Sequence, residues 1–161
     1  MIKPGIAIIA IGAALCFSAI AAEDNEEKVS LDKLPAAVAK ALKQQAGKDK
    51  ITDLSKEKEH GKTLYEATFK RDGRVHDVTV DEEGNLVSDE ETIPTSEAPQ
   101  AIHDAIEREH PGAKIEKLER ITEGKKVSYE ALLSSKGKRE EIKFDTKGKV
   151  IEREDKTGSK D

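Results

Sequence analysis

The sequence contains no tryptophan, and only 3% of its 161 residues are aromatic. Large aromatic side chains supply much of the buried area of ordinary cores, so this fold has to pack mainly around aliphatic residues. Cysteine is almost absent as well, because Cys16 is its single occurrence and lies in the apolar N-terminal stretch. Disulfides and a catalytic thiolate are therefore excluded for the chain that follows this stretch.

A clustered basic region is also missing. Asp and Glu number 33 against 28 Lys and Arg, which gives a net charge of -5, and the two signs alternate closely along the chain. Nucleic-acid binding needs a concentrated basic face to neutralise phosphates, so we do not expect a nucleic acid as partner. Charged residues make up 38% of the sequence and indicate a well-solvated exterior.

The N-terminus resembles a cleaved secretory signal peptide. Lys3 precedes an apolar run at 6–20, and 19–21 is a small-x-small sequence that signal peptidase accepts. The run is short for a membrane span, which needs about 20 apolar residues. We expect a periplasmic or secreted protein without membrane attachment after cleavage, and a retained N-terminal anchor is the alternative.

A repeat with a period of 64 residues organises the rest of the chain. Tyr-Glu-Ala at 65–67 returns at 129–131. The turn residues return in the same order, Gly73 as Gly137, Asp81 as Asp145 and Gly84 as Gly148. Self-similarity at one fixed period indicates a duplicated structural unit.

Each copy predicts one helix followed by four strands. Apolar residues recur at helical spacing in 34–42 and again in 102–106. After each helix the apolar period changes to two, and short glycine-bearing turns divide the strands, which favours antiparallel neighbours. The sequence therefore predicts an α+β fold of two tandem modules, each with one helix packed on a four-stranded antiparallel β-meander.

The predicted boundaries follow from composition and from the repeat. They are a signal peptide at 1–21, a flexible acidic leader at 22–31, the first repeat at 32–91, a linker at 92–95, the second repeat at 96–154 and a disordered tail at 155–161.

These motifs together resemble the PepSY-like, β-lactamase-inhibitor-like domain. The shared features are a Leu-Pro or Ala-Pro helix start, the Tyr-Glu-Ala strand, a turn glycine and an Asp-x-x-Gly hairpin, and they cover about residues 32–154. The resemblance implies an exported protein with a broad open sheet surface. It also implies a non-catalytic role in binding and restraining an extracytoplasmic hydrolase or peptidase.

The strand alternation assigns one face of each sheet to the helix and leaves the other open. The partner is expected to be an envelope or secreted protein that this monomer binds through the open face, with assembly through exposed strand edges as an alternative. The residues predicted on the open face are Leu64, Glu66, Thr68, Asp77, Thr79, Ser128, Glu130, Leu132, Glu141 and Lys143.

Two other chemistries were considered. Glu66 and Glu130 could act as an acid and base pair, but the outward half of an alternating strand explains their recurrence, so we expect neither an enzyme nor a cofactor. His103, Glu107 and His110 lie four and three residues apart on the second predicted helix, where they could converge on a divalent metal. A small-ligand or metal-binding envelope protein is therefore the alternative function.

Overall fold

The structure, a computed structural model, describes residues 26–59 and 61–158. The helices in this part of the chain are α1 (Ala36–Ala46) and α2 (Gln100–Glu109), each preceded by a 3₁₀ turn, at Leu31–Lys33 and Thr95–Glu97. The strands are β1 (Glu27–Lys28), β2 (Ile51–Glu59), β3 (Lys62–Arg71), β4 (Arg74–Asp81), β5 (Leu86–Thr92), β6 (Lys114–Glu123), β7 (Lys126–Ser135), β8 (Lys138–Asp145) and β9 (Val150–Asp155).

The nine strands of the described residues form one antiparallel sheet, ordered β1 to β9 as in the sequence. The predicted fold of two tandem modules is therefore wrong. The two halves share a sheet because β5 pairs with β6, which aligns Asp89 with Thr122 and Thr92 with Glu119. Without this pairing, both strands would present edges of unpaired backbone N–H and C=O groups.

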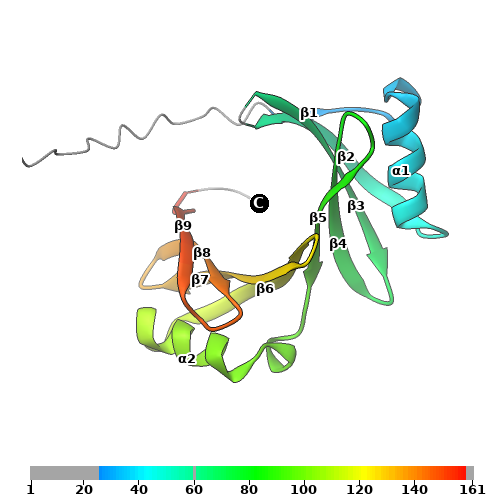
Figure 1. Cartoon of the computed structure of the whole chain (residues 1–161). Coiled ribbons are helices and arrows are strands. Elements are labelled where there is room, and N and C mark those ends of the chain that lie inside the picture. The colour runs from blue at the N-terminus through cyan, green and yellow to red at the C-terminus, as the bar shows by residue number, and fades with distance from the viewer. Residues whose placement is uncertain (1–25, 60, 159–161) are drawn as a thin grey trace, which may run out of the picture.

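Both helices lie on the outer, convex side of the curved sheet (Figure 1). Helix α1 buries Val38 and Leu42, and α2 buries Ile102 and Ile106, so each helix turns one apolar stripe toward the strands. The buried residues form two core clusters, one beneath each helix. The opposite, concave side of the sheet carries neither of these helices.

Contacts on the helix side also join the halves. The side chain of Glu91 on β5 lies 2.6 Å from Arg74 and is bonded to Arg120 of β6 as well. Ile93, which follows β5, is buried in the second core, and its N–H donates to the Leu118 carbonyl at 2.9 Å. The halves are thus connected by backbone pairing, by a buried carboxylate and by a residue after β5 that is buried in the second core.

The turns after β4 and β8 pack directly against the helices. Asp145 accepts hydrogen bonds from the N–H groups of Lys147 and Lys149, at 2.8 and 3.0 Å, which closes the second turn. In that turn Gly148 has a φ of +75°, and a Cβ there would lie 2.3 Å from the carbonyl oxygen of Ala101 in α2. This position therefore requires glycine both for its backbone conformation and for the space available.

The segment predicted as a flexible leader, 22–31, is described from residue 26 and contains strand β1. Glu27 pairs with Lys56 of β2, and the Val29 N–H donates to the Leu54 carbonyl at 3.0 Å. This pairing satisfies backbone groups along part of the β2 edge, which is why the leader is ordered here. The predicted signal peptide, 1–21, lies outside the described residues.

At the other end, β9 extends to Asp155, the first residue of the predicted disordered tail, and the Lys156 N–H donates to the Arg139 carbonyl at 3.0 Å.

Neither α1 nor α2, the helices of the described part, has the length and apolar character needed to cross a membrane.

Candidate functional site

The concave face is the candidate site. We use this name for the side of the sheet that points away from the helices, and the strand register places all ten predicted face residues there. Glu66 lies opposite Thr79, and Glu130 lies opposite Lys143. The remaining predicted residues lie an even number of positions from these four along the same strands, so they share the face. They are Leu64, Thr68, Asp77, Ser128, Leu132 and Glu141. Their role in binding stays a prediction.

Curvature partly buries this face although the helices lie on the other side. Leu64, Thr79 and Leu132 are each less than a tenth exposed. The Thr68 hydroxyl is 2.5 Å from the Asp77 carboxylate, so part of its polarity is satisfied within the sheet. A concave, partly desolvated surface strengthens the electrostatic interactions of the groups it holds.

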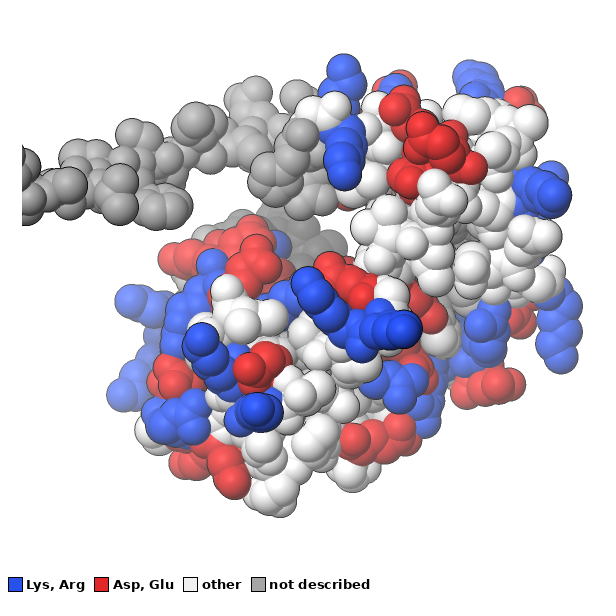
Figure 2. Space-filling view, in the orientation of Figure 1, with Lys and Arg blue, Asp and Glu red and all other residues white. Residues whose placement is uncertain are grey.

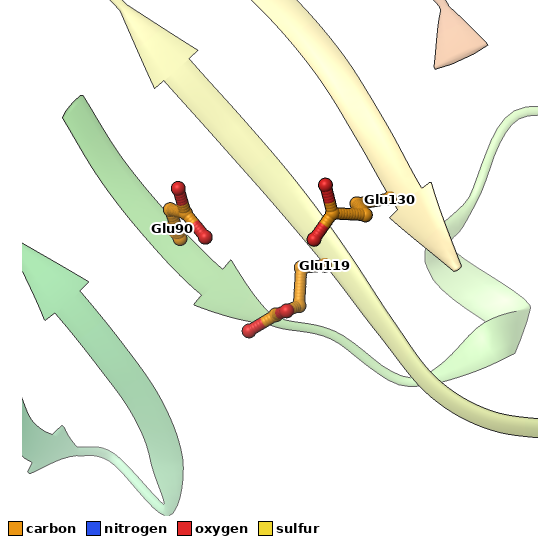
Figure 3. A group of neighbouring side chains, drawn as sticks. All are labelled: Glu90, Glu119 and Glu130. Carbon is orange, nitrogen blue, oxygen red and sulfur yellow. The ribbon is translucent and has the colours of Figure 1, made fainter. Parts of the chain in front are cut away.

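Three carboxyl groups meet at the junction of the halves. Glu90 of β5, Glu119 of β6 and Glu130 of β7 each offer an oxygen within 4.8 Å of the others. Figure 3 shows the three side chains directed toward one space from neighbouring strands. Glu119 is 3% exposed and lies 2.8 Å from the ammonium group of Lys117, which partly compensates its charge.

These acids sit in an environment that disfavours their charged form. Burial raises the pKa of Glu66 to about 7, with repulsion from Asp77 adding to the effect. Burial likewise raises the pKa of Glu90 to about 7, and Glu119 opposes its ionisation while Lys143 favours it. The pKa of Glu130 is also raised, by burial and then by its neighbour Glu141. The face therefore holds acids that would gain from a cation.

We expect stability to fall as the pH rises from about 4.5 to 7, because the folded state binds protons at Glu66 and Glu90 that the unfolded state releases. Replacing Glu90→Gln removes one such group. At pH 9 the variant should have a free energy of unfolding about 1–2 kcal/mol above wild type, after discounting for solvent screening, and at pH 4.5 it should match.

Urea unfolding at the two pH values measures this difference. Glu82→Gln, at an exposed turn residue, is the matched control and should show no such pH-dependent gain. An equal gain at both pH values for Glu90→Gln would contradict the electrostatic explanation.

Two hollows occupy equivalent places in the repeat at the margin of the concave face. One, of about 440 Å³, is lined by Leu64, Asp81 and Val87, and the other, of about 480 Å³, is lined by Ser128 and Asp145 among others. Three of the four large apolar side chains that are exposed in the described part of the chain line these hollows, namely Val87, Val127 and Ile151. Apolar exposure concentrated in this way is typical of interaction surfaces.

Ser128 is the polar residue of greatest interest in the second hollow. It is 6% exposed, and its hydroxyl has no hydrogen-bond partner among the described residues. An unsatisfied buried hydroxyl costs about 1–3 kcal/mol, so a group that supplied the missing hydrogen bond would be stabilised there.

The predicted metal ligands are not brought together. His110 directs Nε2 to Glu140 at 2.7 Å, and Glu107 accepts a hydrogen bond from the Gly112 N–H at 3.3 Å. Within residues 26–59 and 61–158, a group of acidic or histidine side chains spaced for a metal occurs at Glu90, Glu119 and Glu130 and does not include His103.

Glu90 and Glu119 were missed by sequence reasoning. Side chains two residues apart on a strand point to the same side, so Glu90 lies with Ser88, and Glu119 lies with Lys117 and Ile121. This spacing was a signal that both glutamates are on the side away from the helices. Their proximity had no such signal, because it arises from the pairing of β5 with β6.

Charge of one sign does not dominate the surface as a whole. Figure 2 shows lysine and arginine interspersed with acidic residues over the second half of the molecule, in the same view as Figure 1. No broad basic area covers this side of the described residues.

The described residues thus form a curved sheet with both helices on one side and an open concave face on the other. The chain belongs to the family described as "Putative beta-lactamase-inhibitor-like, PepSY-like", whose model matches residues 20–88 and 65–152. Neither this description nor the names of the similar structures below state an enzymatic activity. Among proteins of curated function, none matches the chain.

Solved structures from Bacteroides share the fold. A "putative periplasmic" protein of Bacteroides eggerthii is 17% identical, with a TM-score of 0.65 over 77% of this chain and 90% of that one. A DUF2874 family protein of Bacteroides uniformis is 19% identical, with a TM-score of 0.64 over 78% and 92%. A BLIP-like protein of Bacteroides fragilis is 18% identical, with a TM-score of 0.60 over 80% and 90%. The predicted periplasmic or secreted location agrees with the first of these names.

Proposed function

We propose that the chain is a periplasmic or secreted, non-catalytic module that binds an extracytoplasmic hydrolase or peptidase through its concave face and restrains it. The observation that carries the proposal is a sheet face that neither helix of the described residues covers, in which acidic side chains, partly buried apolar residues and two hollows lie together. Membership of the inhibitor-like family supports this assignment.

The concave shape supports a protein partner. A concave face can receive a convex loop of a partner protein. Its side chains are already partly shielded from water, so binding has less water to displace from them. Leu64 and Leu132 supply apolar contacts, and Glu66 and Glu130 supply polar ones at equivalent positions of the repeat.

Reversing the charge at both glutamates tests the face. We expect Glu66→Lys with Glu130→Lys to reduce, by tenfold or more, the amount of one envelope hydrolase or peptidase that mature residues 22–161 capture after cross-linking. Like charges placed against a complementary partner cost several kcal/mol. Activity of the purified hydrolase, with and without the chain, then measures restraint.

The control reverses two exposed acids beside the helices, Asp32→Lys with Asp104→Lys, which should leave capture unchanged. Equal capture by wild type and the Glu66 and Glu130 variant would reject the concave face as the binding site. Undiminished hydrolase activity in the complex would reject restraint while leaving binding intact.

A further inference from the structure

Among the described residues, the junction of the two halves gathers more acidic than basic side chains. Glu90, Glu119 and Glu130 form the centre, with Asp77 aligned beside Glu90 and Glu141 beside Leu132. The lysines of this region are Lys117, bound to Glu119, Lys156, bound to Glu141, and Lys143, opposite Glu130. The acids outnumber these lysines.

Holding such acids together is unfavourable for the free chain. Burial desolvates the carboxylates, and each lies within reach of another of the same sign. Protons reduce the repulsion, but a fixed cation entering the space between the three side chains would reduce it further. The orphaned hydroxyl of Ser128, two residues from Glu130 on the same face of β7, is a second group that a ligand would satisfy.

We propose that the partner is a protein whose binding loop carries an arginine or lysine, and that this side chain sits between Glu90, Glu119 and Glu130. This inference rests on the proposed function and adds the chemistry of the partner. The guanidinium of arginine offers five donors and suits several carboxylates at once. Apolar residues that flank the cation on the same loop would enter the hollows beside Val87 and Ile151.

Charge complementarity selects this occupant. An uncharged or acidic loop would desolvate the three carboxyl groups further and add no positive charge beyond Lys117 and Lys143, which disfavours binding. A second copy of the chain would present the mixture of both charge signs that Figure 2 shows on one side of the molecule, and such a surface matches a group of acids less well than a basic loop does.

A defined probe tests the proposal with mature residues 22–161. The probe is a cyclic peptide with two adjacent arginines flanked by leucines, and its counterpart carries neutral citrulline in place of arginine. Calorimetric titration at pH 8 should show at least tenfold tighter binding of the arginine peptide. The Glu90→Gln, Glu130→Gln double variant should lose this preference, whereas Asp32→Asn with Asp104→Asn should keep it.

Equal binding of both peptides, or an arginine preference that survives in the Glu90 and Glu130 variant, would overturn the proposal. The proposal would also be overturned if calcium raised the melting temperature through Glu90 and Glu130 and the peptides showed no preference. The space between the three glutamates would then be a divalent-cation site. The two proposals can fail separately. If the charge reversal at Glu66 and Glu130 abolished capture of the hydrolase but the peptides showed no arginine preference, the proposed function would stand and only the cationic loop would be rejected.

Discussion

Gly148→Ala should destabilise the protein by about 2–5 kcal/mol. An L-residue at the observed φ of +75° costs about 1–2 kcal/mol, because its Cβ approaches the adjoining peptide. The added methyl would also meet the Ala101 carbonyl oxygen at 2.3 Å and the Ala105 Cβ at 3.0 Å. Helix α2 would have to move away from the sheet, and overpacking of this kind costs about 1–3 kcal/mol.

Another glycine with a positive φ, in the turn between β7 and β8, supplies a control for the backbone contribution. Gly137 has a φ of +79°, and a Cβ there meets no heavy atom within 4 Å. Gly137→Ala should therefore cost about 1–2 kcal/mol, from the backbone alone. Urea unfolding followed by far-ultraviolet circular dichroism measures both variants. Equal losses would show that contact with α2 contributes nothing to the requirement for glycine at 148.

Phe144→Ala should cost about 3–5 kcal/mol and should unfold both halves together. Phe144 is fully buried in the second core, and truncating it removes apolar contacts and leaves a cavity. A half of about 60 residues buries too little surface to be more than marginally stable alone. Because β5 pairs with β6 and Ile93 enters the second core, loss of the second half exposes surface of the first.

Tyrosine fluorescence can follow the distant half. The sequence has two tyrosines and no tryptophan, so a Tyr129→Phe background leaves Tyr65, in the first core, as the reporter. In this background Phe144→Ala should lower the urea midpoint seen by Tyr65 and by circular dichroism to the same value. If Tyr65 fluorescence reported the same urea midpoint with and without Phe144→Ala in the Tyr129→Phe background, the halves would unfold independently.

Much of the local structure could be read from the sequence because it depends on neighbouring residues. The Asp-x-x-Gly pairs predicted the turns at Asp81 and Asp145, where the carboxylates accept the backbone N–H groups of the turn. Period-two alternation predicted which side chains share a face, and it placed Glu66 and Glu130 correctly on the side away from the helices.

The candidate site was only partly predictable. Alternation placed ten residues on one face, but it carried no information about depth or about the neighbours across the junction. Glu119 is almost fully buried because the sheet curves around it, although its own sequence context is polar and charged. The sequence Glu-Lys-Leu-Glu at 116–119 would suit a solvated strand equally well.

By itself, the sequence determined the repeat, the turns, the two helices and the alternating faces, because each follows from spacings of a few residues or from a fixed period of 64. Only the tertiary structure decided that the repeats share one curved sheet and that Glu90 meets Glu119 and Glu130. The physical reason is that β5 and β6 pair through backbone hydrogen bonds. Every residue except proline can make such bonds, so side-chain pattern does not say which two edges will join.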